Sequence, residues 1–182
     1  AIQTNKEKEA IELLKKGLVY IGSNQQLLVD FYTQLAEAYN EIKDFSKSDY
    51  YFEKVLNLQP NNILVLNNYS YYLSVRGENL DRALRMSKKT IEKEPRSSIY
   101  LDTYAWILFQ QGKLDKAKEY IQKAMQYGGS NDGDVVEHYG DILFKLGKEE
   151  KALEQWKKAR SLGNRSTVLQ EKINSYTLSG EK

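Results

Sequence analysis

An internal repeat with a period of 34 to 35 residues is the strongest constraint on what this chain can fold into. When the chain is aligned on itself, small residues recur at spacings of 34, 35 and 35, at Ala36, Ser70, Ala105 and Gly140. Further along each copy a second small residue recurs, at Ser48, Ala83, Ala117 and Ala152. Small residues let two helix axes approach to about 8–10 Å. The pattern therefore predicts that each copy forms a pair of helices that cross at these two positions.

Short turns separate the two helices of each copy. They are Lys43-Asp44, Arg76-Gly77-Glu78, Gln111-Gly112-Lys113 and Leu146-Gly147-Lys148. Glycine supplies the left-handed conformation that commonly ends a helix, and Pro60 and Pro95 close the second helix of their copies. Because turns this short force antiparallel packing, each copy is predicted to be a helical hairpin.

Composition limits the classes of function. The 182 residues are enough to bury a substantial core. With no cysteine, a disulfide framework, a thiolate zinc site and a cysteine nucleophile are excluded. Lys+Arg 27 against Asp+Glu 25 gives +2, which is too balanced to indicate a nucleic-acid binder or a polybasic membrane anchor. No apolar run approaches the ~18 residues of a membrane span.

Catalytic and metal-binding motifs are also missing from the sequence. His138 is the only histidine, and it could share a helical face with Asp134 and Asp141 to hold a metal. The alternative, which we favour, is that these are ordinary polar side chains of the kind that the first helix of any such repeat displays into a groove. There is no phosphate loop or dinucleotide fingerprint. We therefore expect no metal, no cofactor and no catalysis.

The repeat pattern resembles the tetratricopeptide repeat (TPR), a helix-turn-helix of about 34 residues with small residues at the crossing. The clearest copy is LDTYAWILFQQGKLDKAKEYIQKAM, at residues 101–125. The resemblance implies an all-α, right-handed α-solenoid of stacked hairpins that forms a single array over residues 1–182. We place the full repeats at 29–62, 63–97, 98–131 and 133–166.

The two ends of the array depart from this pattern. Residues 1–24 are expected to be the second helix of a truncated repeat, so that the sequence begins inside a longer array. Ile11, Leu14 and Leu18 would then lie uncovered, and self-association through this end is expected. Residues 167–180 are expected to form a polar capping helix, with Lys172 on its polar face. Its apolar face is expected to hold Val168, Leu169, Ile173 and Tyr176.

The resemblance also implies a concave groove lined by the first helix of each repeat. The family's inward-facing positions include Phe109 and Phe144 here. Lys145 is the only basic residue at these positions. Seven of the residues there are acidic: Asp30, Glu37, Glu41, Asp102, Asp134, Glu137 and Asp141. An acidic wall favours a neutral or basic ligand. Family members that bind the acidic tails of heat-shock chaperones carry a clamp of lysines, arginine and asparagines, of which only Asn68 is matched.

The candidate peptide-binding residues of this groove are Asn67, Asn68, Tyr71, Asp102, Trp106, Glu137, His138 and Asp141. Asn67 and Asn68 can hydrogen-bond the backbone of an extended peptide, and Trp106 offers flat apolar surface for a side chain. In the alternative interpretation, Trp106 packs against the neighbouring hairpin and the asparagines bind only water.

The predicted function is a non-catalytic scaffold for protein–protein interaction. Two alternatives remain open: a helical repeat that binds single-stranded nucleic acid, which would need a basic groove, and an accessory domain of a larger enzyme. The segment VLNNYSYYLSVRGENLDRA at 65–83 resembles the C-terminal repeats of long bacterial TPR proteins, some of them envelope lipoproteins. This resemblance implies a bacterial cytoplasmic or cell-envelope location, and a fragment of a periplasmic lipoprotein is one of the options.

Overall fold

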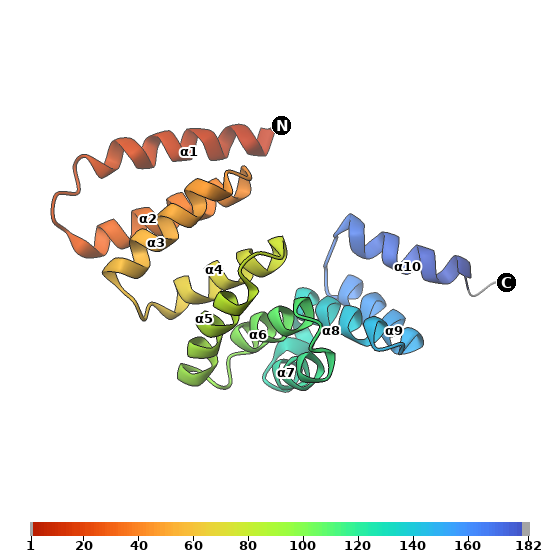
Figure 1. Cartoon of the computed structure of the whole chain (residues 1–182). Coiled ribbons are helices and arrows are strands. Elements are labelled where there is room, and N and C mark those ends of the chain that lie inside the picture. Colours follow the sequence, from red (N-terminus) through yellow and green to blue (C-terminus); the bar gives the residue numbers. More distant parts are fainter. Residues whose placement is uncertain (1, 180–182) are drawn as a thin grey trace. The chain divides into compact units, whose positions relative to one another are not determined.

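The computed structural model describes the backbone of residues 2–179 and the side chains of residues 6–176. Over these residues the chain forms ten α-helices, one 3₁₀ turn and no strand, which confirms the predicted all-α class (Figure 1). The elements are α1 (Ile2–Leu18), α2 (Gln25–Glu41), α3 (Phe45–Leu58), α4 (Ile63–Arg76), α5 (Leu80–Lys93), α6 (Ser98–Gln110), α7 (Leu114–Gln126), η1 (Gly129–Asn131), α8 (Gly133–Lys145), α9 (Glu149–Ser161) and α10 (Thr167–Ser179). None of the described helices is both long and apolar enough to cross a membrane.

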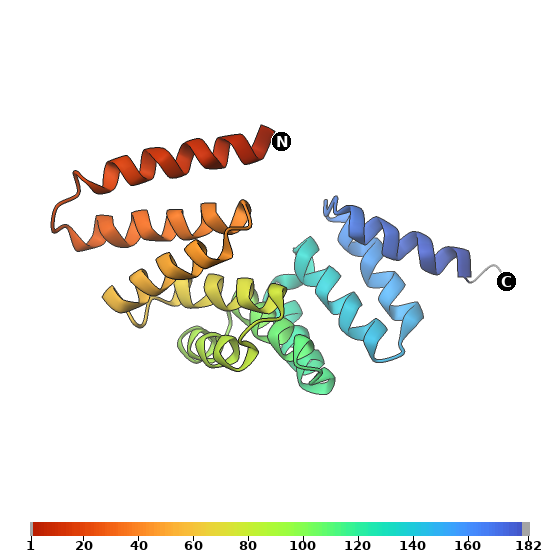
Figure 2. The same cartoon turned by 45° about the horizontal axis from the view of Figure 1, so that its top comes forward.

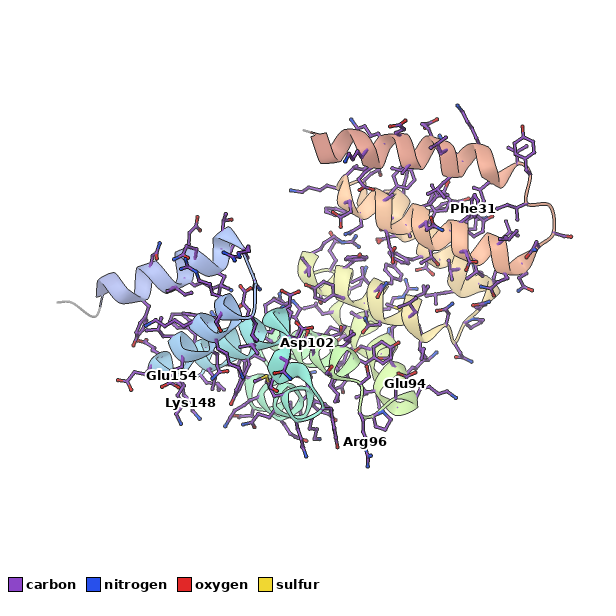
Figure 3. All side chains as sticks on the ribbon, turned by 180° about the vertical axis from the view of Figure 1, so that it is seen from behind. Phe31, Glu94, Arg96, Asp102, Lys148 and Glu154 are labelled. Carbon is purple, nitrogen blue, oxygen red and sulfur yellow. The ribbon has the colours of Figure 1, made fainter. Side chains whose placement is uncertain are left out.

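The chain divides into two compact units, Ala1–Tyr72 and Leu73–Lys182, and the boundary lies inside α4. In the first unit, α1 packs on α2 and α2 packs on α3 (Figures 1 and 2). Gly17 lets α1 approach α2 closely, because a Cβ atom at this position would lie 2.5 Å from Cε1 of Phe31. Figure 3 shows Phe31 between these two helices.

The expectation that Ile11, Leu14 and Leu18 of α1 lie uncovered is wrong. Ile11 is only 4% exposed, and Leu14 and Leu18 pack against the same buried cluster. These side chains face α2, the next helix along the chain, so they need no preceding helix to cover them. Among the described residues at this end, Leu13, Val19 and Tyr20 are exposed, at 63%, 80% and 88%.

In the second unit, α6 pairs with α7 and α8 pairs with α9, while α10 lies beside α9 (Figure 2). The small residues that the repeat placed at the helix crossings are buried: Ala105, Ala117, Gly140 and Ala152. Gly140 permits a particularly close approach, since a Cβ atom there would lie 2.5 Å from Cδ1 of Trp156. The predicted crossings in these two hairpins are therefore confirmed.

The predicted left-handed turns are also present. Gly77, Gly112 and Gly147 have φ angles of 70°, 73° and 71°. Lys43 has the same conformation, with φ of 62°, in the turn between α2 and α3. A residue with a Cβ atom adopts this conformation at an energetic cost, so the first hairpin uses the same turn as the others without its glycine.

Helix α10 occupies the segment expected to form the capping helix, and residue 180 lies outside the described residues. Leu169 and Ile173 are buried against the core of α8 and α9, as expected. Two assignments are wrong: Val168 is 54% exposed, and Lys172 is partly buried against α8. Leu169 and Ile173 lie four positions apart and share the buried face of the helix. Lys172 borders this face and pairs with Glu137 and Asp141 of α8.

Candidate functional site

A buried ion pair joins the first helices α6 and α8 of the second unit. Nδ1 of His138 lies 2.9 Å and 3.0 Å from the two carboxylate oxygens of Asp102. Burial lowers the pKa of His138, but the charge and hydrogen bond of Asp102, helped by the charges of Asp141 and Glu137, outweigh burial, so the net direction is upward. The histidine therefore holds its proton more tightly than an exposed one, and Nδ1–H donates to Asp102.

Trp106 of α6 lies between two other aromatic groups. Its ring centroid is 4.2 Å from that of His138 and 4.9 Å from that of Phe109, with interplanar angles of 22° and 21°. Its Nε1 atom is buried and has no hydrogen-bond partner within the described residues. Trp106 thus packs against the neighbouring hairpin, which is the alternative that the sequence left open.

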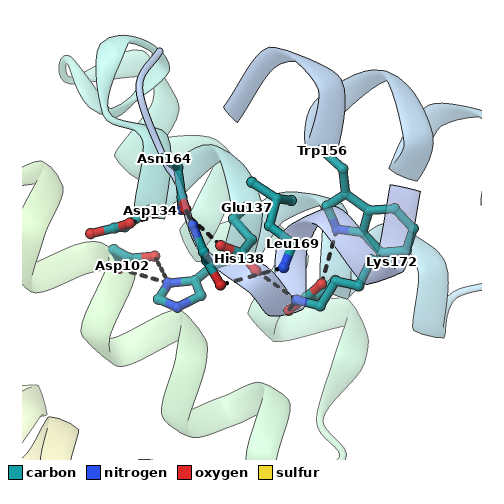
Figure 4. Close-up of polar contacts among 10 residues, drawn as sticks. Asp102, Asp134, Glu137, His138, Trp156, Asn164, Leu169 and Lys172 are labelled. Atoms are coloured by element: carbon teal, nitrogen blue, oxygen red, sulfur yellow. Dashed lines mark hydrogen bonds and ion pairs between the residues drawn. The ribbon is translucent and has the colours of Figure 1, made fainter. Parts of the chain in front are cut away.

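The acidic side chains of α8 are paired with groups from the C-terminal part of the chain (Figure 4). The ammonium group of Lys172 lies 2.7 Å from Oε1 of Glu137 and 2.7 Å from Oδ2 of Asp141. The amide of Asn164 donates to Oε2 of Glu137 at 2.8 Å, and Nε1 of Trp156 donates to Oδ1 of Asp141 at 2.9 Å. Burial lowers the pKa of Lys172, but the hydrogen bonds that its ammonium group donates to Asp141 and Glu137 outweigh burial and raise the pKa.

Both units show the same type of contact between acidic side chains and donors one repeat later. In each case, an acidic side chain on a first helix accepts a hydrogen bond from a helix that follows 31 to 36 residues further on. The contacts are Glu37 with Asn68 at 3.0 Å, Asp102 with His138 at 2.9 Å and Glu137 with Lys172 at 2.7 Å. Helix α10 therefore occupies the place of the first helix of a further repeat.

Sequence reasoning missed Lys172 and Asn164. The signal that could have found Lys172 is the repeat period itself, because Lys172 follows Glu137 by 35 residues. Their presence changes the electrostatics of the site, since two of the carboxylates that we counted toward an acidic wall, Glu137 and Asp141, already share a cation. In the second unit, the wall is less acidic than the sequence implied.

Three of the sequence-predicted residues belong to the first unit. Asn67 is 5% exposed, and its amide donates to Asn68 at 3.3 Å. Asn68 in turn donates to Glu37, and the ring of Tyr71 lies 6.0 Å from that of Tyr72. Burial, followed by the negative charges of Glu37 and Glu41, raises the pKa of Tyr72 to about 12.

The side chains considered as metal ligands make other contacts. Asp134 accepts a hydrogen bond from Asn164 at 2.9 Å, Asp141 pairs with Lys172, and His138 pairs with Asp102. Within the part of the chain that the structure describes, no group of three histidine, aspartate or glutamate side chains is arranged to hold a metal ion.

A cleft of about 440 Å³ opens between α8, α9 and α10, with Phe109 of α6 at one side. Its lining includes four aromatic side chains, Phe109, Phe144, Trp156 and Tyr176, and four charged ones, Asp141, Lys145, Glu149 and Lys172. Phe144 is 45% exposed and so presents much of its ring to solvent. In contrast, Lys148 and Glu154 are exposed side chains that do not line the cleft, and they project outward in Figure 3.

Comparisons with known proteins agree with the repeat pattern. The tetratricopeptide repeat family model matches residues 2–169. A TPR repeat-containing protein of Pseudomonas aeruginosa, PA4667, is 30% identical over 129 residues, which cover 69% of this chain and 21% of that protein. The human mitochondrial import receptor subunit TOM70 is 24% identical over 127 residues, covering 70% of this chain and 21% of TOM70. The chain thus spans about a fifth of the length of these relatives.

Solved structures show the same fold. The thermophilic TPR protein TTC0263 of Thermus thermophilus matches with a TM-score of 0.74 and 17% identity, over 96% of this chain and 92% of that one. MamA from Desulfovibrio magneticus RS-1, from residue 41 to its end, matches with a TM-score of 0.70 and 19% identity, over 91% of each chain. Together with the hairpins, turns and helix crossings described above, these matches show that the chain belongs to the tetratricopeptide repeat family.

Proposed function

We propose that this chain is a non-catalytic scaffold that binds an extended segment of a partner protein along its first helices. The TPR fold generally serves as a scaffold for protein–protein interaction, and one relative, TOM70, is by name an import receptor subunit. In this proposal the partner segment is a peptide rather than a nucleic acid, and it contacts α6 and α8 in the second unit.

The cleft beside α10 is the observation that supports this proposal best. Its volume of about 440 Å³ lies within the range of about 300–1,000 Å³ that is usual for ligand pockets. Phe109, Phe144 and Trp156 line the cleft, and the ring centroids of Phe144 and Trp156 lie 5.4 Å apart. Buried aromatic contacts of this kind commonly supply most of the affinity of an interface. The cleft is therefore our candidate pocket for one anchoring side chain of the partner.

The residues selected from the sequence keep narrower roles in this proposal. In the first unit, Asn68 and Tyr71 remain proposed contacts for a peptide, while Asn67 holds the side chain of Asn68. In the second unit, Trp106 keeps one wall of the cleft in place, because it stacks on Phe109. Its other ring partner, His138, is held in turn by Asp102.

The experiment is a screen of the full chain against a peptide array, followed by affinity measurements on the peptides that bind. Phe144→Ala should weaken binding by about tenfold or more, which corresponds to about 1.4 kcal/mol. Tyr127→Ala is the matched control, because Tyr127 is a similarly exposed aromatic residue, at 40%, that does not line the cleft. Equal losses in both variants, or salt-dependent binding of single-stranded oligonucleotides in place of peptides, would contradict the proposal.

A further inference from the structure

The charged side chains that line the cleft beside α10, taken together with the carboxylate that pairs with Lys172 from outside the lining, carry a slight excess of negative charge. Its lining contains the carboxylates of Asp141 and Glu149 and the ammonium groups of Lys145 and Lys172. Glu137 adds a third carboxylate, because it holds Lys172 at 2.7 Å. Two positive charges against three negative ones give 2 − 3 = −1. A cationic group entering the cleft is therefore favoured over an anionic one.

The aromatic side chains that line the cleft also favour a cation. The face of an aromatic ring is negative and attracts cations within about 6 Å of its centre. The chain already contains one such contact: the ammonium group of Lys172 lies 5.9 Å from the ring centre of Trp156 and 2.7 Å from Asp141. This part of the cleft thus holds a cation supplied by α10.

A carboxylate of a partner would have fewer groups of opposite charge to pair with in this cleft than a cation would. The charge of Lys172 is already shared by Glu137 and Asp141. Lys145 is exposed and forms no ion pair among the described residues, so it is the one cation of the cleft left for an anion. An acidic side chain would also face Glu149 across the same cleft.

We propose that this cleft binds an arginine side chain of the partner segment, and that Lys172 opposes this binding because it already neutralises Glu137 and Asp141. This inference rests on the proposed function. Arginine fits better than lysine, because its planar guanidinium can stack on the exposed ring of Phe144 while it pairs with a carboxylate. Glu149, which lines the cleft and accepts a hydrogen bond from the hydroxyl of Tyr176, supplies that carboxylate.

The first test uses three short peptides that differ at one position, Gly-Ser-X-Ser-Gly, with both ends blocked. X is arginine, its neutral isostere citrulline, or glutamate. In a titration of the ¹⁵N-labelled full chain followed by NMR, the arginine peptide should bind about fivefold more tightly than the citrulline peptide and should shift the indole N–H signal of Trp156. Equal affinity of arginine and citrulline, or a preference for glutamate, would overturn the proposal.

The second test changes the internal cation. Lys172→Met leaves Glu137 and Asp141 without their ammonium group, so the arginine peptide should bind about tenfold more tightly to this variant than to the unmodified chain, while citrulline binding should stay unchanged. Lys157→Met, which removes an exposed lysine that does not line the cleft, should change neither affinity. A purely structural role for Lys172 would give a lower melting temperature and no gain in arginine binding.

Glu149→Gln provides an independent measurement, since it alters the cleft without touching the pairing of Lys172. It should weaken arginine binding by about fivefold and leave citrulline binding unchanged. Unaltered arginine binding would overturn the assignment of Glu149. If a peptide from the array depends on Phe144 but contains no basic residue, the arginine proposal fails while the scaffold function stands. If no binding depends on Phe144, both fail.

Discussion

Nδ1 of His138, on α8, lies 2.9 Å from the Asp102 carboxylate on α6. This contact joins two successive repeats through the only histidine of the chain. It also fixes the ring that stacks on Trp106, at a centroid distance of 4.2 Å. A change in the charge of His138 therefore acts on the packing of α6 against α8.

The stability of the chain should depend on the titration of His138. The folded-state pKa of His138 is raised above the usual value of about 6.5. A raised pKa contributes stability that is fully present below about pH 6.5 and is lost as the pH rises through the folded-state value. The free energy of unfolding, measured with urea, should therefore fall as the pH is raised above about 6.5, and His138→Gln should remove this part of the slope. Asp102→Asn is the control and should also flatten the profile; a His138→Gln profile parallel to that of the unmodified chain would exclude this titration.

Lys172→Met should lower the free energy of unfolding by about 1–3 kcal/mol. The reason is that Glu137 and Asp141, which are largely buried, lose the cation that hydrogen-bonds to both of them. Lys157→Met should cost less than about 0.5 kcal/mol, because Lys157 is an exposed residue on the preceding helix, α9. Denaturant unfolding of both variants measures the difference, and equal effects would show that the Lys172 contacts contribute no net stability.

The sequence predicted the features that depend on local geometry. Gly112 ends α6 in a left-handed turn, and Ala117 lies buried at the crossing, because both follow from positions within one repeat. The role of Lys172 did not follow, because its partners lie on a helix 31 to 35 residues earlier. The position of Trp106 stayed open for a related reason: whether it meets a ligand or His138 depends on the spacing between hairpins.

Ala117→Leu should lower the free energy of unfolding by about 1–3 kcal/mol, the usual cost of overpacking a core. Ala117 is fully buried within the cluster that contains Leu101, Leu108 and Ile121, where three additional carbons have no space. Lys116→Leu is the matched control, since its side chain is exposed on the same helix. Thermal unfolding of the two variants compares them directly, and an unchanged midpoint for Ala117→Leu would place the helix crossing elsewhere.

Lys43→Gly should stabilise the chain by up to about 1 kcal/mol. Lys43 has a φ of 62°, a left-handed conformation that is unfavourable for a residue with a Cβ atom and that glycine adopts freely. Gly112→Ala, at the corresponding turn between α6 and α7, should destabilise by a similar amount. Urea unfolding should therefore move the midpoints of the two variants in opposite directions. A loss of stability in Lys43→Gly would mean that the lysine side chain contributes more than its backbone conformation costs.

Gly140 is the one crossing position of the second unit where the repeat requires glycine rather than alanine. A Cβ atom at Gly140 would lie 2.5 Å from both Cδ1 and Nε1 of Trp156 and 3.2 Å from the carbonyl oxygen of Ala152. Gly140→Ala must therefore move the indole ring, which also weakens its hydrogen bond to Asp141, and we expect a loss of about 1–3 kcal/mol. Because the clash is with one side chain, Trp156→Leu should make the glycine unnecessary. In a double-mutant cycle, Gly140→Ala should cost at least about 1 kcal/mol less in the Trp156→Leu background than in the unmodified chain. Additive losses would show that the backbone of α9 near Ala152, rather than the indole ring, excludes the Cβ atom.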